Sequence, residues 1–219
     1  MIGLDVGEVE SGAFSTECLR SLRQRGLSGV RLAVSDDHEG LKTAIARMLT
    51  SAWQRCTVHF VRDMLYHCRR DQRGLVAAAL REVFNAENQA QARERVTHMI
   101  ARLEPVAPKV CRLLEDAEED LIAFYPFPPE HWTKLRSTNP LERVNKEIGR
   151  RTDVVGIFPN DTAVIRLAGA LISEQNDERL VQRGYLSAES MQLILSAERS
   201  EDPSLEQQHQ KEVAELNAA

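Results

Sequence analysis

The sequence places two acidic residues, Asp36 and Glu142, where their carboxylates could take part in chemistry. Glu142 falls near the start of a predicted helix over residues 139–151, which Asn139 would cap at its amino end. Arginine and lysine residues follow along this helix. A carboxylate among cations beside a helix N-terminus can hold a metal ion next to a polyanion. The alternative is a capping box, in which Glu142 only bonds back to the backbone of Asn139.

Asp36 follows a run of alternating apolar residues over 30–35, which predicts a strand. A helical apolar period begins at Leu41, so Asp36 would lie at the carboxyl end of a strand, where open α/β sheets collect functional groups. The alternative is that Asp36 or Asp37 merely caps the helix that follows. A second predicted strand over 52–59 completes a strand–helix–strand unit with the size of a parallel crossover.

Three runs resemble signatures of one protein family, and they are Ser35–Leu41, the Cys56-x-x-His59 pair and Ser137–Lys146. In their order and spacing they are similar to the bacterial Mutator-type transposases, the insertion-sequence relatives of the plant Mutator element. The run over 151–160 also resembles the family's segment after its acidic motif. The resemblance covers about residues 1–195. It is the ordered combination of motifs, more than any single one, that makes the resemblance specific.

The resemblance implies a ribonuclease H-like core with a triad of two aspartates and one glutamate. Such a triad holds two divalent ions, normally Mg²⁺, through its carboxylate oxygens. Carried over by position, the second aspartate is Asp36 and the glutamate is Glu142, both metal ligands. Cys56 and His59 match a family signature that lies near the active site. The implied activity is metal-dependent cleavage and strand transfer of DNA, at transposon ends and target, by a homo-oligomer.

The first aspartate of the family's triad has no convincing counterpart in this sequence. Residues 2–6 correspond to a later strand of the family, in which Asp5 would be a non-catalytic acid. We therefore expect an amino-terminally truncated transposase with no strand-transfer activity of its own. One alternative is a non-catalytic fragment that binds DNA or oligomerises and so regulates a full-length transposase. Another is a metal-dependent nuclease of the same fold that needs no first aspartate.

The expected fold is α/β, with a partial ribonuclease H-like core built on strands at 2–6, 30–35 and 52–59. A large all-helical insertion and a helical C-terminus complete it. The expected divisions are 1–60 for the partial core, 61–133 for the helical insertion, 134–195 for the C-terminal part of the catalytic core with the Glu142 helix, and 196–219 for an acidic tail. The composition of that tail is typical of disordered segments.

The distribution of charge favours a nucleic-acid partner more than the net charge of −5 does. Residues 134–151 hold six Lys or Arg against two Glu, whereas residues 174–219 hold ten acids against four bases. The candidate phosphate contacts are Arg136, Arg143, Lys146, Arg150 and Arg151. The alternative is a solvated helix stabilised by pairs four residues apart, such as Glu142 with Lys146 and Glu147 with Arg151, and both roles are compatible.

Cysteine and histidine spacing raises the possibility of a zinc site made by Cys56, His59, His67 and Cys68. His67 and Cys68 are adjacent, which makes chelation by both awkward, so packing beside the active site is the favoured interpretation. The four cysteines of the chain show no paired framework and are expected to be reduced thiols. With no apolar run near the ~20 residues that span a bilayer, we expect a cytoplasmic protein without a membrane segment.

Overall fold

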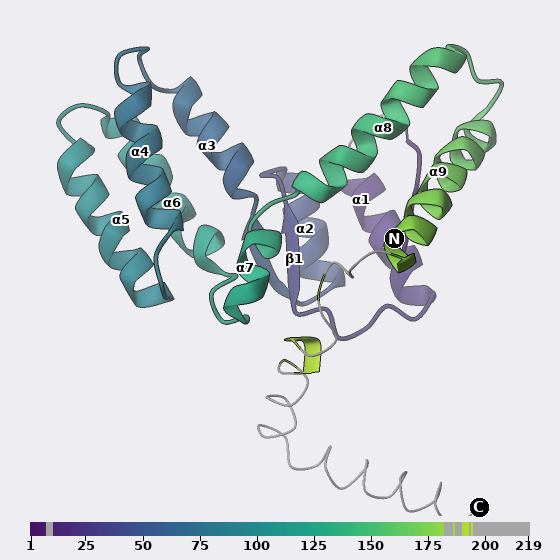
Figure 1. The fold of residues 1–219 in the computed structure, drawn as a ribbon, viewed down its shortest axis with the longest axis horizontal. Helices are drawn as coiled ribbons and strands as arrows, with labels where there is room; N and C mark the ends of the chain where they lie inside the picture. Colours follow the sequence, from purple (N-terminus) through teal and green to yellow (C-terminus); the bar gives the residue numbers. More distant parts are fainter. Residues whose placement is uncertain (8–10, 182–185, 187–189, 193, 195–219) are drawn as a thin grey trace, which may run out of the picture.

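The computed structural model describes residues 1–7, 11–181, 186, 190–192 and 194, so the predicted acidic tail over 196–219 lies outside the described residues. In chain order the elements are α1 (Gly12–Gln24), β1 (Leu32–Ser35), α2 (Glu39–Met48), β2 (Ala52–Arg55), α3 (Thr57–Tyr66), α4 (Arg73–Phe84), α5 (Gln89–Leu103), α6 (Pro108–Ile122), α7 (Pro129–Leu135), α8 (Asn139–Val155) and α9 (Asp161–Val181). Figure 1 shows that they form a V. One arm holds α3 to α6, the other holds α8 and α9, and β1, α2 and α7 lie where the arms meet.

The predicted strand–helix–strand unit is present at the base of the V. β1 and β2 pair in parallel, with Leu32 opposite Ala52 and Ser35 opposite Arg55. Parallel strands need a crossover connection, and α2 supplies it. The strand predicted over 30–35 is therefore confirmed with its start two residues later.

α1 lies against α2 at a very close crossing. A Cβ atom added at Gly40 would lie 2.7 Å from the Cα atom of Gly12, which is closer than real Cβ contacts come. Glycine at both positions lets the two backbones touch there. This contact fixes the first turn of α2, and so the loop that carries Asp36, against the amino-terminal helix.

One predicted strand is absent, and another is shorter than predicted. Residues 2–6 are coil, and within the described residues the sheet has β1 and β2 alone. The backbone of residues 2–6 has no neighbouring strand to pair with and finds other partners. For example, Arg25 Nη2 donates to the Ile2 carbonyl over 2.7 Å. The strand predicted over 52–59 ends at Arg55, because the apolar spacing of Phe60 and Met64 belongs to α3. The described chain is thus mostly helical around a small parallel sheet.

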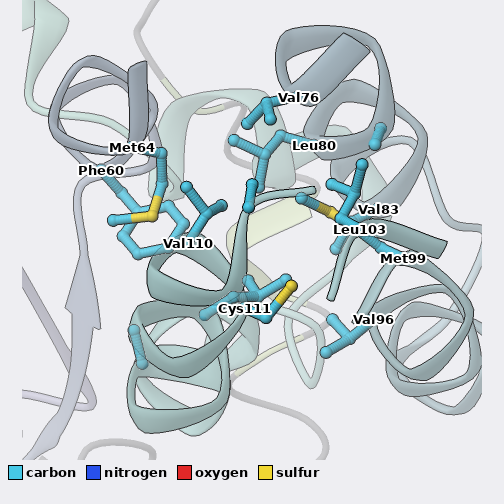
Figure 2. Close-up of a cluster of buried hydrophobic side chains, with 14 of the residues drawn as sticks. Phe60, Met64, Val76, Leu80, Val83, Val96, Met99, Leu103, Val110 and Cys111 are labelled. Carbon is cyan, nitrogen blue, oxygen red and sulfur yellow. The ribbon is translucent and has the colours of Figure 1, made fainter. Parts of the chain in front are cut away.

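The block predicted as helical over 61–133 is helical, and it holds the main hydrophobic core. Each helix of this arm turns one apolar face inward at helical spacing, as Val76, Leu80 and Val83 do on α4. Figure 2 shows these side chains meeting those of α3, α5 and α6 in one cluster. The cluster buries residues from four consecutive helices. It therefore makes this arm a firm support for His59, which lies at the amino end of α3.

One buried glutamine joins the sheet to this helical arm. Gln54 on β2 has no exposed surface, and its Nε2 donates to the Leu121 carbonyl over 3.1 Å and to the Arg55 carbonyl over 2.8 Å. Its Oε1 accepts from the Phe124 N–H over 3.0 Å. The side chain thereby satisfies backbone groups at the end of α6 that water does not reach. Beside it, Lys42 Nζ on α2 lies 2.6 Å from Asp120 Oδ2.

The four cysteines are free thiols, as expected, with Cys18 half-buried and the other three buried. Burial raises the pKa of Cys111 to about 11, with Glu104 and Glu115 adding to the effect. Among the described helices, none combines the length and the apolar content needed to cross a membrane.

Candidate active site

The structure brings Asp36 and Glu142 together from distant parts of the chain. Asp36 directly follows β1, and Glu142 lies in the first turn of α8. Between them stands Thr138, whose Oγ1 lies 3.3 Å from Asp36 Oδ1 and 3.4 Å from Glu142 Oε1. The hydroxyl carries one proton and donates it to Asp36, Glu142 or Cys56 Sγ at any one time, so both carboxylates lie in contact with the same hydroxyl oxygen.

His59 lies between the same two carboxylates. Its Nδ1 is 2.7 Å from Asp36 Oδ1 and its Nε2 is 3.4 Å from Glu142 Oε1. The contact with Asp36 is a close ion-pair approach without the alignment of a hydrogen bond, because Nδ1 has no hydrogen-bond partner. Burial by itself lowers the pKa of His59, but Cys56 and the two carboxylates outweigh it and leave that pKa raised.

Cys56 closes the cluster from the buried side. It follows β2 directly, and its N–H donates to the Ser35 carbonyl over 2.8 Å, which continues the strand pairing by one bond. Its Sγ accepts from the N–H and the hydroxyl of Thr138, over 3.4 and 3.3 Å. Burial raises the pKa of Cys56, yet the hydrogen bonds from Thr138 and His59 leave it lowered. Ligand atoms of Asp36, Cys56 and His59 all lie within 4.8 Å of one another.

Neither carboxylate of the site is used as a helix cap. The amino end of α2 is capped by His38, whose Nδ1 accepts from the Leu41 N–H over 3.2 Å. Asp37 instead lies 3.0 Å from Arg55 Nη1. The alternative in which Asp36 or Asp37 caps α2 is therefore wrong, and the Asp36 carboxylate is left to the site.

The prediction that Asn139 caps α8 is also wrong, by one residue. Thr138 occupies the cap position, and its carbonyl accepts from the Glu142 N–H over 3.0 Å. Asn139 is therefore already helical, and the capping box with Glu142 does not form. Of the apolar residues on this helix Val144 is buried, whereas Leu141 is 50% exposed. The helix is consequently held mainly near its amino end and by its packing on α9.

Backbone contacts fix the start of α3 to the end of α7. The N–H and the hydroxyl of Thr57 both donate to the Arg136 carbonyl over 2.9 Å. The Arg136 guanidinium in turn donates to the Phe84 carbonyl over 2.6 Å. Arg136, predicted as a phosphate contact, thus has a bond to the scaffold that sets the position of Thr138 two residues later.

The other predicted DNA contacts lie along α8. Arg143 and Lys146 are exposed, and neither makes an ion pair within the described part of the chain. Arg150 and Arg151 both bond to Glu147, and these bonds lower the pKa of Glu147 to about 2. The predicted pair of Glu147 with Arg151 is therefore confirmed.

The predicted pair of Glu142 with Lys146 is wrong, because Glu142 turns to the cluster instead. It contacts Thr138 and His59, and its Oε2 lies 3.9 Å from Arg62 Nη2. The four-residue zinc alternative fails as well, because Cys68 is buried in the helical core with its Sγ bonded to the Met64 carbonyl.

Sequence reasoning missed two residues of the cluster, Thr138 and Arg62. Arg62 Nη1 lies 3.1 Å from His59 Nε2, three residues along α3. The predicted strand over 52–59 hid this contact. If the helix had been predicted to begin at Thr57, the spacing of three residues would have placed Arg62 beside His59. For Thr138, the available signal was its place just before the Asn139–Pro140 helix start.

Comparison with known proteins agrees with the predicted resemblance. Residues 1–181 match the family model described as "Transposase, Mutator family". The chain is 36% identical over 209 residues to the transposase for insertion sequence element IS1081 of Mycobacterium tuberculosis, across 95% of this chain and 50% of that protein.

Two further relatives are also matched over about half of their own length. The transposase for insertion sequence element IS406 of Burkholderia multivorans is 36% identical over 189 residues, across 85% of this chain and 49% of that protein. The transposase for IS256 in transposon Tn4001 of Staphylococcus aureus is 34% identical over 181 residues, across 81% and 46%. The chain thus spans about half the length of these curated relatives. It belongs to the Mutator family of transposases.

Proposed function

We propose that this chain contributes Asp36 and Glu142 as two of the three metal-binding carboxylates of a transposase that cleaves and joins DNA. The observation that carries the proposal is the contact of both carboxylates with the Thr138 hydroxyl, at 3.3 and 3.4 Å. Relatives that share at least a third of the aligned residues are transposases of bacterial insertion sequences. DNA is accordingly the proposed substrate.

The donor set fits a divalent ion of the Mg²⁺ type. Both groups are acceptor-only oxygens, which such hard cations prefer. Their side chains are 52% and 37% exposed, so solvent and a phosphate group reach them. Bound there, divalent ions would activate a water or a 3′-hydroxyl and stabilise the leaving oxygen. Without them, His59 and Arg62 offset the repulsion between the two carboxylates.

A third carboxylate is not part of this cluster in the described residues. Asp5, the nearest candidate by sequence motif, lies in the coil before α1 and accepts from the Val6 N–H over 2.9 Å. The ligand-type side chains gathered at Asp36 do not include it. Because two carboxylates hold a pair of divalent ions poorly, we expect the 219-residue chain to show no strand transfer by itself.

The test is a chimera in which this chain replaces the matching half of a full-length Mutator-family transposase. Excision of a marked element measures its activity, and the isolated chain is assayed beside it. We expect excision by the chimera and none by the chain alone. A folded chimera without activity would contradict the proposal, as would Mg²⁺-dependent cleavage by the isolated chain that Asp36→Ala abolishes.

The exposed cations of α8 are the proposed DNA contacts, and they lead to a prediction about salt. Replacing Arg143 and Lys146 together by alanine should weaken DNA binding about tenfold at low salt and reduce the slope of log affinity against log salt by about 2. Fluorescence anisotropy with a labelled duplex at several salt concentrations measures both. The matched control is Arg69→Ala with Arg70→Ala, two exposed cations on the far arm. A salt response that is already flat in the unchanged chain would contradict the assignment.

A second candidate function is regulation of a full-length transposase by a non-catalytic partner. It is favoured by three exposed apolar side chains at the far end of α8, Val154, Val155 and Ile157, which are 82%, 53% and 91% exposed. Apolar residues gathered on a surface often mark a contact with another subunit. Co-expression with a full-length relative distinguishes the two functions, because a regulator must lower the transposition frequency.

A further inference from the structure

Beside the two carboxylates proposed for Mg²⁺ lies a second set of ligands with different chemistry. Cys56, His59 and Asp36 offer one thiol, one imidazole and one carboxylate, with their ligand atoms within 4.8 Å of one another. We propose that these three residues bind one thiophilic divalent cation of the Zn²⁺ type. This proposal does not depend on the transposase activity proposed above.

The donor types favour such an ion over Mg²⁺. Zn²⁺ binds cysteine sulfur, histidine nitrogen and carboxylate oxygen, commonly with three protein ligands and one open position for water. Mg²⁺ prefers an octahedron of oxygens and gains little from a thiolate. The Cys56 thiol would release its proton to solvent as the sulfur–metal bond forms, which leaves one thiolate ligand and no redox change.

The geometry of His59 gives independent support. Its Nδ1 is buried and has no hydrogen-bond partner, and it lies on the side of Asp36. Asp36 Oδ1 approaches this nitrogen to 2.7 Å without the alignment of a hydrogen bond, and a cation bound by both atoms would give each of them a well-placed partner. The opposite nitrogen, Nε2, lies 3.4 Å from Glu142 Oε1 and 3.1 Å from Arg62 Nη1, so binding of an ion at Nδ1 requires the tautomer in which Nε2 donates to Glu142 and Arg62 turns away. A carboxylate behind the far nitrogen is the usual way in which a metal-binding histidine is oriented.

The backbone holds two of the three ligands in place. Cys56 is fully buried and is tied by its N–H to the Ser35 carbonyl, the residue just before Asp36. His59 lies in the first turn of α3, whose far end is packed in the helical core. The Asp36 side chain is half exposed, so it can close the small remaining distance onto an ion. An ion held here would occupy Asp36 and so oppose binding of Mg²⁺ at Asp36 and Glu142.

The test is a titration of the chelator-treated 219-residue chain with Co²⁺, which reports on the same ligands by its colour. We expect a thiolate-to-cobalt absorption band and tetrahedral visible bands that saturate at one equivalent. Zn²⁺ should bleach them, and excess Mg²⁺ should not. Cys56→Ser should remove the thiolate band, and Asp36→Asn or His59→Gln should weaken Co²⁺ binding about 100-fold or more.

Matched controls separate this site from incidental binding. Cys18→Ser removes the half-buried thiol, and Asp37→Asn removes the neighbouring carboxylate, and both should leave the titration unchanged. If Cys56→Ser fails to fold by circular dichroism, the exposed-side variants Asp36→Asn and His59→Gln decide the question. A colourless unchanged chain, or a thiolate band that survives in folded Cys56→Ser, would overturn the proposal.

Discussion

Replacing Asp36 by asparagine should lower excision by the chimeric transposase about 10³-fold or more. Asparagine keeps the shape of the side chain but removes the charge that a divalent ion requires, and such ions contribute several kcal/mol to the transition state. At 1.36 kcal/mol for each factor of ten, the loss reaches that size. Glu142→Gln should have an effect of the same order. Excision frequency in cells, with protein levels checked on blots, measures both.

A neighbouring acid provides the control for this experiment. Asp37 is bonded to Arg55, so its carboxylate does not face the cluster. Asp37→Asn should therefore leave excision within about threefold of the unchanged chimera, since surface changes of this kind alter stability little. If Asp37→Asn were as damaging as Asp36→Asn, the assignment of the metal ligand to Asp36 would be wrong.

The second large effect concerns stability and one buried amide. Gln54→Leu should lower the free energy of unfolding by about 3 kcal/mol or more. Leucine has a similar volume, but it leaves the Phe124 N–H and the Leu121 carbonyl without their partner, at ~1–3 kcal/mol for each buried group. Urea unfolding followed by circular dichroism measures the change.

The control for that measurement is Gln24→Leu, at the exposed end of α1. There the same substitution should change the free energy of unfolding by no more than about 0.5 kcal/mol. Equal effects at the two positions would mean that Gln54 acts through general polarity and that its three hydrogen bonds matter little.

Local patterns predicted the elements that depend on local forces. The alternating residues of β1, the helical spacing of the arm from α3 to α6 and the Glu142 helix are all read from side chains close in sequence. The segment over 2–6 has a comparable alternating pattern, yet it is coil, because a strand exists only where a neighbour completes its ladder. Pairing is a long-range property that the pattern of a single segment does not contain.

In the candidate site, too, the residues within sequence motifs were predicted, whereas a residue whose role depends on the helix boundary was not. Family motifs identified Asp36, Glu142, Cys56 and His59, and the structure brings all four together. The hydroxyl of Thr138 at their centre was missed, because its role depends on where α8 begins. A helix boundary that is wrong by one residue turns a cap into an interior position, and spacing rules alone rarely fix boundaries that finely.

Because Glu142 lies near the start of α8, a movement of the far end of this helix displaces Glu142 little. The helix has 17 residues and is about 25 Å long, and Glu142 lies in its first turn, about 5 Å from the start. A swing of the arm by about 10° about Thr138 would carry Val155 through about 4 Å and Glu142 through only about 1 Å. The basic residues farther out would then follow a bent or shifted duplex, while the two carboxylates kept their spacing.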